Sequence, residues 1–237
     1  MESSLTNHRF QRERHQVIGD LLERFNPDFL CCEGIGFGGG TRIALELDEY
    51  RESVDIDLIC PSTASYRAVR QTIGEHDLGA LLRLPVTLAR EVRTTRDKVV
   101  TAIEHAGHVV KLEIISFADW QLGMVDHPLF PIPVLDQAAC FTSKLTAAND
   151  RGRAPPYKDV VDLIVMQAYW GAIPDAAVRE AERHYGRTVL PRAQAAIAHF
   201  LELSDADLSK VTRTLGMKHD FFEHLDRPAK PTCDGGL

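Results

Sequence analysis

The sequence predicts an α/β protein, in which a mixed, twisted sheet with flanking helices is followed by a helical carboxy-terminal domain. Extended and helical segments alternate in the first half of the chain, whereas every segment from residue 136 onward has helical periodicity. Prolines 128, 131 and 133 mark the change between the two patterns. The predicted limits are 1–130 for the sheet domain with its amino-terminal helix, 131–226 for the helical domain, and 227–237 for a flexible tail.

The amino-terminal part of the sheet domain begins with a helix. Residues 10–25 carry apolar side chains at helical spacing, which predicts an amphipathic helix packed on the sheet. Asn26-Pro27-Asp28 ends this helix, because the residue before a proline avoids helical dihedral angles. The apolar segment 29–32 is predicted as a strand that leads into a run of three glycines, Gly38 to Gly40, and a short helix over 41–47.

The run of glycines is a candidate phosphate site. Glycine permits positive φ angles and close approach to a ligand, and the amide groups at the start of the next helix face that turn. Thr41 is predicted either to cap this helix or to donate its hydroxyl proton to a ligand. A glycine-rich turn alone is also typical of linkers, so the interpretation depends on the neighbouring segment of the chain.

An acidic strand comes next in the chain. Residues 54–60 are predicted to form a buried strand, in which Asp55 and Asp57 project from the same face. Two neighbouring carboxylates repel each other unless a cation lies between them, and hard oxygen ligands of this kind suit Mg²⁺. The alternative is an edge strand with two solvated acids. The buried character of the segment favours the metal site, because paired acids in such a strand need a compensating charge.

The rest of the sheet domain is predicted from one helix and three extended segments. Residues 64–76 form the helix, and the extended segments are 86–89, 98–103 and 109–115, the last two joined by a hairpin at Ala106-Gly107. In the last strand Lys111 and Glu113 share a face. Glu113 has two open interpretations: a third carboxylate at the metal, or a solvent-facing partner of Lys111 or Arg93.

The helical domain contains a second group of charged residues. Helices are predicted over 136–149, 157–170, 174–185, 189–203 and 204–215. Lys144 lies on an otherwise apolar helix, either as a cation in a cleft or as a surface lysine. Asp159 and Asp162, three residues apart, share one helix face. Acids near a helix start also suit its dipole, so both interpretations stay open.

Composition and charge restrict the class of protein. The 237 residues are 44% hydrophobic and 26% charged, which is ordinary for a globular chain of one large or two small cores. A formal net charge of -7 disfavours broad nucleic-acid coating but permits a local basic patch. Five cysteines without CxxC spacing argue against a zinc site. No apolar run approaches a membrane span, so we expect a soluble, cytoplasmic protein without a membrane partner.

Two motifs together resemble a known family. Gly39-Gly40-Thr41 followed by Arg51-x-Ser53-x-Asp55-Ile56-Asp57-Leu58 is similar to the AbiEii/AbiGii-type toxin nucleotidyltransferases, within the polymerase beta-like nucleotidyltransferase superfamily. A second block, Ser143-Lys144-Leu145 and then Lys158-Asp159 to Asp162-Leu163, agrees with the pattern of the same family. The resemblance covers about residues 29–165. In one departure, Gly38 stands where the family often has a basic residue, and Arg42 is a candidate substitute.

The resemblance implies a set of site residues. The catalytic residues would be Asp55, Asp57, Lys144, Asp159 and Asp162, with Asp159 or Asp162 orienting Lys144 or contacting the substrate. Nucleotide-binding residues would be Gly39, Gly40, Thr41, Arg42, Arg51, Ser53 and Lys158. The Mg²⁺ ligands would be Asp55, Asp57 and, in its metal-binding interpretation, Glu113.

The resemblance also implies a function. The expected reaction moves a nucleoside monophosphate from a nucleoside triphosphate to an acceptor, with the tRNA 3′ end as the expected acceptor. The protein would then be the toxin of a toxin–antitoxin pair, with a cognate antitoxin as partner. Two alternatives remain: a nucleotidyltransferase for a small molecule such as an aminoglycoside, and a non-catalytic binding module.

Overall fold

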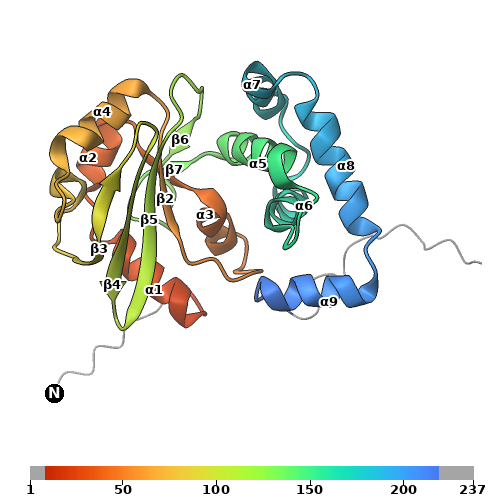
Figure 1. The fold of residues 1–237 in the computed structure, drawn as a ribbon, viewed down its shortest axis with the longest axis horizontal. Coiled ribbons are helices and arrows are strands. Elements are labelled where there is room, and N and C mark those ends of the chain that lie inside the picture. Colours follow the sequence, from red (N-terminus) through yellow and green to blue (C-terminus); the bar gives the residue numbers. More distant parts are fainter. Residues whose placement is uncertain (1–8, 219–237) are drawn as a thin grey trace, which may run out of the picture.

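The computed structural model describes residues 9–218 and confirms the predicted α/β class (Figure 1). Within this range the strands form one mixed sheet in the order β3-β4-β5-β2-β1-β7-β6. The strands are β1 (Gly36–Gly38), β2 (Ile56–Cys60), β3 (Thr87–Thr94), β4 (Lys98–His105), β5 (His108–Ser116), β6 (Met124–Val125) and β7 (Val134–Leu135). The helices are α1 (Glu13–Leu22), α2 (Pro27–Cys32), α3 (Gly39–Glu46), α4 (Thr63–Thr72), α5 (Gln137–Arg151), α6 (Lys158–Trp170), α7 (Asp175–Tyr185), α8 (Val189–Leu201) and α9 (Asp205–Thr214), with a 3-10 turn at Gly79–Leu81.

The segment 29–32 was predicted wrongly as a strand. It is the end of α2, whose first residue is Pro27 and whose N-cap is Asn26. The Asn26 side chain accepts a hydrogen bond from the Phe29 amide at 3.3 Å, and a proline in the first turn needs no amide partner. The strand that enters the glycine turn is instead β1, three residues long.

The centre of the sheet brings the acidic segment beside the last long strand. β2 runs antiparallel to β1 and parallel to β5, and Asp57 lies opposite Glu113 in the register. The predicted hairpin at Ala106-Gly107 is confirmed: both residues have positive φ, 48° and 78°, as a tight two-residue turn requires. In β5 the alternate residues Val110, Leu112 and Ile114 are buried, so Lys111 and Glu113 face the other side.

Two apolar cores hold the structure together. The first fills the space between the sheet and the helices α1, α2 and α4, and the second joins α3 to the helices α5 to α9. In Figure 1, α3 lies between the sheet and the carboxy-terminal helices, and it contacts both. β7 pairs with β1, so the sheet extends past the predicted domain limit at residue 130. The predicted tail at 227–237 lies outside the described residues.

The helices of the carboxy-terminal half begin and end close to their predicted limits. Asp136 and Ser204 cap α5 and α9 by accepting hydrogen bonds from amides in the first turn. No helix between residues 9 and 218 has the length and apolar character needed to cross a membrane.

Candidate active site

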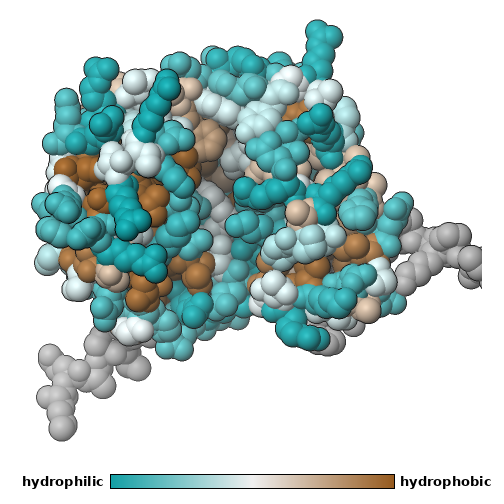
Figure 2. All heavy atoms as spheres, viewed as in Figure 1, coloured by the Kyte–Doolittle hydropathy of each residue, from teal (hydrophilic) through white to brown (hydrophobic). Residues whose placement is uncertain are grey.

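A cleft of about 420 Å³ lies where the sheet, α3, α5 and α6 meet. Figure 2 shows the surface hollowed between the two halves of the molecule. This volume is within the range of small-molecule sites, roughly 300–1,000 Å³. Residues from both sequence motifs line it, although more than eighty positions separate the motifs. The predicted residues in the lining are Gly39, Gly40, Thr41, Arg51, Ser53, Asp55, Asp57, Glu113, Lys144, Lys158 and Asp159.

Gly39 and Gly40 are required because two charged side chains pack directly against them. A Cβ atom on Gly39 would lie 1.9 Å from Asp57 Oδ2, and the φ angle of Gly39 is +71°. A Cβ on Gly40 would lie 2.2 Å from Arg51 Nη2. Such distances are far below van der Waals contact, so only glycine lets Asp57 and Arg51 approach the start of α3. The glycine pair therefore brings the acidic strand and Arg51 to the helix N-terminus.

The acidic wall of the cleft carries unbalanced negative charge. Burial, and after it the nearby Asp55 and Glu113 carboxylates, together raise the pKa of Asp57 to about 6. A divalent cation held by Asp55 and Asp57 would relieve this repulsion, and carboxylate oxygens are the donors that Mg²⁺ prefers. The donor set of this wall therefore fits Mg²⁺.

The Glu113 carboxylate is paired with lysines in this structure. Its side chain forms ion pairs with Lys111 and, at 3.4 Å, with Lys98. In residues 9–218 the one group of three acidic or histidine ligands within 4.8 Å of one another is Glu75, His76 and Glu91, all exposed and outside the cleft lining. The structure therefore favours the interpretation of Glu113 as an ion-pair partner of Lys111 over that of a metal ligand. Arg93, the other predicted partner, forms no ion pair with Glu113. The two lysines balance a charge that would otherwise be free for a metal.

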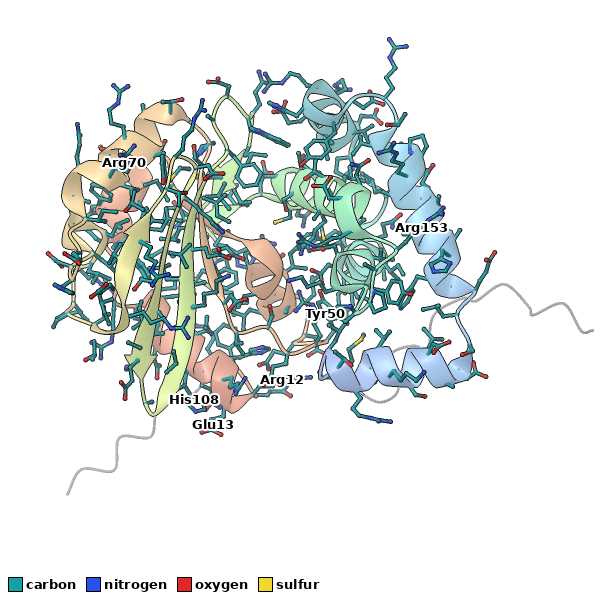
Figure 3. The ribbon with its side chains drawn as sticks, viewed as in Figure 1. Arg12, Glu13, Tyr50, Arg70, His108 and Arg153 are labelled. Carbon is teal, nitrogen blue, oxygen red and sulfur yellow. The ribbon has the colours of Figure 1, made fainter. Side chains whose placement is uncertain are left out.

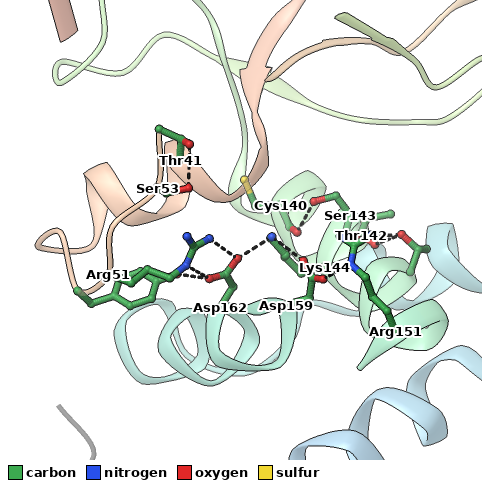
Figure 4. Close-up of polar contacts among 12 residues, drawn as sticks. Thr41, Arg51, Ser53, Cys140, Thr142, Ser143, Lys144, Arg151, Asp159 and Asp162 are labelled. Atoms are coloured by element: carbon green, nitrogen blue, oxygen red, sulfur yellow. Dashed lines mark hydrogen bonds and ion pairs between the residues drawn. The ribbon is translucent and has the colours of Figure 1, made fainter. Parts of the chain in front are cut away.

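The opposite wall is cationic and is built around Lys144 (Figure 4). Lys144 Nζ lies 2.9 Å from Asp159 Oδ1 and 2.6 Å from Asp162 Oδ2. Burial alone would lower the pKa of Lys144, but the charges of Asp162 and Asp159 outweigh it and raise the pKa, so Lys144 stays protonated. Both acids of the predicted pair thus contact Lys144. Only Asp159 lines the cleft, whereas Asp162 is fully buried behind it.

Asp162 connects this wall to the loop before the acidic strand. It accepts hydrogen bonds from Arg51 Nε at 2.7 Å and Arg51 Nη2 at 2.9 Å, and from the Tyr50 hydroxyl. Burial would raise the pKa of Asp162, but Arg51 and Lys144 together hold it well below its usual range. Arg151 binds the outer oxygen of Asp159 at 2.6 Å. Three cations therefore share two carboxylates, which leaves one positive charge in excess.

Arg42 is not a phosphate contact in this structure, which corrects its predicted role. Its side chain is 1% exposed and points away from the cleft, into the core between α3 and α6. Nη2 lies 2.7 Å from Glu46, four residues later, and the guanidinium lies 5.0 Å from the Trp170 ring centroid. The i, i+4 spacing and the aromatic contact explain this position.

The basic residues around the α5–α6 connection separate into two groups. Lys158 and Arg151 line the cleft, and Lys158 is exposed at its mouth. Arg153, in the loop after α5, lines a different cavity beside α8 (Figure 3). The end of α5, the start of α6 and the loop between them therefore contribute cations to two surfaces.

Sequence reasoning missed a buried chain of hydrogen bonds behind Ser53. The Ser53 amide donates to His15 Nε2 at 3.2 Å, and His15 Nδ1 lies 2.7 Å from Glu49 Oε1. Glu49 also accepts from the amides of residues 11 and 12. The Ser53 hydroxyl is 2.9 Å from Thr41 Oγ1, at the start of α3. His15 shares the buried helix face with Ile18 and Leu22, and this spacing was the available signal in the sequence.

This arrangement requires a neutral His15 and gives a pH prediction. Burial lowers the pKa of His15, partly offset by Glu49. The unfolded chain therefore binds a proton at higher pH than the folded one, and stability falls as the pH drops below about 6.5. His15→Gln is expected to destabilise the protein by roughly 1–3 kcal/mol at neutral pH, because buried Glu49 loses one of its hydrogen-bond partners and the Ser53 amide loses its acceptor. It should also flatten the fall in melting temperature on acidification.

The measurement is the melting temperature of wild type, His15→Gln and His108→Gln between about pH 7.5 and pH 5.5. His108 pairs with Glu13 at the molecular surface (Figure 3), so its replacement controls for the loss of any histidine. Equal pH slopes for wild type and His15→Gln would contradict the role of His15.

An apolar end closes the cleft. Phe117, Leu122 and Tyr185 line it there, and Phe117 packs edge-on against Trp120 with ring centroids 5.2 Å apart. Trp120 is stacked on His184 at 3.8 Å. This aromatic group offers a surface of the kind on which a nucleobase stacks.

Comparison with known protein families agrees with this geometry. The family described as "Nucleotidyl transferase AbiEii toxin, Type IV TA system" matches residues 20–228. The chain belongs to the AbiEii nucleotidyltransferase toxin family. The match includes both motifs and the whole cleft, and membership of this family supports nucleotidyltransferase activity and an antitoxin partner.

Comparison with solved structures finds proteins of low sequence identity. The chain is similar to an antigenic nucleotidyltransferase-like protein from Paracoccidioides brasiliensis, with 15% identity, a TM-score of 0.43, and coverage of 88% of this chain and 95% of that one. It is also similar to JHP933 from Helicobacter pylori, with 16% identity, a TM-score of 0.45, and coverage of 85% and 78%. A third is ANT(2")-Ia in complex with adenylyl-2"-tobramycin, with 15% identity, a TM-score of 0.39, and coverage of 77% and 98%. No curated protein sequence matches the chain.

Proposed function

We propose that this AbiEii-family protein transfers a nucleoside monophosphate from a nucleoside triphosphate to an acceptor hydroxyl in the cleft, in a Mg²⁺-dependent reaction. The observation that carries the proposal is the opposition of the two walls. Asp55 and Asp57 form one wall, with the pKa of Asp57 raised to about 6, and the other carries one positive charge in excess. A metal-bound triphosphate needs both a carboxylate pair and a facing cation group.

The residues have separate tasks in this proposal. Asp55 and Asp57 would hold Mg²⁺, which when bound neutralises the triphosphate and the leaving pyrophosphate. Lys144 presents its ammonium group to the phosphates, and its two carboxylate partners keep it charged and fixed in place. Amide groups at the start of α3 face the same volume and suit an anion. The aromatic end of the cleft would take the base.

The proposed bond changes follow the family reaction. The acceptor hydroxyl oxygen forms a bond to the α-phosphorus, and the bond from that phosphorus to pyrophosphate breaks. Pyrophosphate leaves with the bonding electrons, and the hydroxyl proton passes to water. Charge that develops on the phosphoryl oxygens is stabilised by Lys144 and by Arg51, whose orientation Asp162 fixes.

We further propose that the acceptor is the 3′ end of tRNA in the cytoplasm. Modification of that end would block aminoacylation and stop growth, as expected of a toxin whose partner is an antitoxin. The family membership supports this biological role, and a small-molecule acceptor is the competing outcome.

The test uses purified protein, Mg²⁺ and each nucleoside triphosphate radiolabelled at the α-phosphate, with total bacterial RNA as acceptor. We expect label in the tRNA band with wild type and with Asp126→Asn, an exposed carboxylate variant outside the cleft. Asp57→Asn should give none. Transfer at the wild-type rate by Asp57→Asn would contradict the mechanism, and label in no RNA would contradict the acceptor.

A further inference from the structure

A second cavity of about 790 Å³ continues directly from the cleft. It lies over the strands β3, β4 and β5, and two of its lining residues, Asp55 and Lys111, also line the cleft. The two cavities therefore meet at one of the two candidate metal ligands. A molecule bound in the second cavity would have one end at the position where transfer takes place.

This cavity lies on the open face of the sheet. In β5, Val110 and Ile114 are buried in the core beneath α1 and α4, so Val109 and Lys111 face the other side. Val109 is 61% exposed, which shows that no described helix covers this face. The face is accessible along the outer strands up to Asp55.

The lining of the cavity combines an apolar floor with cations. Ala89, Val100 and Ala102 supply apolar surface, and Arg90 and Arg93 add two exposed guanidinium groups. Neither guanidinium forms an ion pair with a described residue, whereas Lys111 pairs with Glu113. Glu91 lines the same cavity but is not paired with either arginine, so among the described residues both guanidinium groups are open to a ligand.

This combination fits a polynucleotide. Arginines bind phosphate oxygens, and an apolar floor accepts ribose and base faces without reading their sequence. A small acceptor would need neither the length nor the cations of this cavity. We infer that the cavity, here called the acceptor groove, binds the last nucleotides of a single-stranded RNA acceptor, with its terminal hydroxyl at Asp55. This inference rests on the proposed function.

A competing basic surface provides the matched control. Arg67 and Arg70 of α4, with Arg96, line a cavity of about 620 Å³. α4 packs through Tyr66 and Val69 on the core side of β2, so these arginines lie on the opposite face of the sheet from Asp55 and Asp57. Figure 3 labels Arg70 at α4. Replacing two arginines there removes the same charge without touching the acceptor groove.

The experiment measures the fluorescence anisotropy of a 5′-fluorescein oligoribonucleotide of about eight nucleotides that ends in CCA. The probe is titrated with wild type, with the groove variant Arg90→Gln/Arg93→Gln and with the α4 variant Arg67→Gln/Arg70→Gln, each over a range of salt concentrations. We expect the groove variant to bind at least about tenfold more weakly at low salt, with a salt slope smaller by about 1.4, since single strands contribute about 0.7 per phosphate neutralised. The α4 variant should bind like wild type. In transfer assays the groove variant should raise KM for the oligoribonucleotide and leave KM for the nucleoside triphosphate unchanged.

The outcomes separate the inference from the proposed function. The inference would be overturned if the groove variant bound RNA with unchanged affinity, even where wild type transfers nucleotide. That result is expected if the partner in the groove is an acidic protein. Equal weakening by the α4 variant would also overturn it. RNA binding that depends on Arg90 and Arg93, in a protein that binds no nucleoside triphosphate, would support the groove and contradict the proposed function.

Discussion

Asp57→Asn is expected to abolish nucleotide transfer and, at the same time, to raise the melting temperature of the metal-free protein near neutral pH. The raised pKa of Asp57, about 6 against a reference value of 3.8, means that the folded state opposes its ionisation. Near neutral pH this opposition costs about 3 kcal/mol of stability. Asparagine removes the charge while keeping the shape of the side chain. The metal-free wild-type protein would thus have a lower melting temperature than the inactive Asp57→Asn variant.

The pH dependence of this effect has a defined sign. The folded-state pKa of Asp57 lies above the unfolded value. At pH values between the two pKa values, the folded protein therefore binds more protons than the unfolded chain. Its stability therefore falls as the pH rises from about 4 to about 6. The melting-temperature gap between Asp57→Asn and wild type should open across that range and then stay constant. Mg²⁺ should raise the melting temperature of wild type and leave that of Asp57→Asn almost unchanged.

Calorimetry or thermal fluorescence across this pH range, with and without Mg²⁺, is the measurement. Asp126→Asn serves as the control, because it removes an exposed carboxylate outside the cleft. A lower melting temperature for Asp57→Asn near neutral pH would show that the carboxylate has a stabilising partner, contrary to the electrostatics described above.

Much of the site was predictable because its residues follow short-range rules. Period-two alternation placed Asp55 and Asp57 together, and the i, i+3 spacing placed Asp159 and Asp162 on one face. In the structure Asp55, Asp57 and Asp159 line the cleft, and Asp162 lies behind it. The glycine pair was predicted to bind phosphate. The structure adds a second reason for glycine, because a Cβ atom at either position would clash with Asp57 or Arg51.

The errors came from signals with two interpretations. A short apolar run such as 29–32 suits a strand or a buried helix, and the start signal Asn26-Pro27 was interpreted only as the end of the preceding helix. Arg42 was assigned from its closeness to the glycines in sequence, but in the structure it pairs with Glu46 on a face of α3 that does not line the cleft. The His15 to Ser53 connection joins segments far apart in the chain, and no local rule predicts it.

Asp162→Asn is expected to be the most destabilising single change at the site. Asp162 is fully buried and is the shared partner of Arg51 and Lys144. Its neutralisation leaves two buried cations with too little compensating charge, which costs about 3–5 kcal/mol when a buried pair is broken. Arg51 and Lys144 would then repel each other and leave their positions, so transfer should fall by orders of magnitude even well below the melting temperature.

Asp159→Asn is the matched comparison, because it removes the other carboxylate bound to Lys144. Its second partner, Arg151, is 57% exposed and can be solvated when the pair is lost. Lys144 also keeps Asp162, so the expected loss is only about 1 kcal/mol, close to that of a solvent-exposed pair. Urea unfolding of both variants gives the two free energies. Equal destabilisation would mean that the carboxylates share the cations evenly, and the assignment of Asp162 as the residue that positions Arg51 and Lys144 would then be wrong.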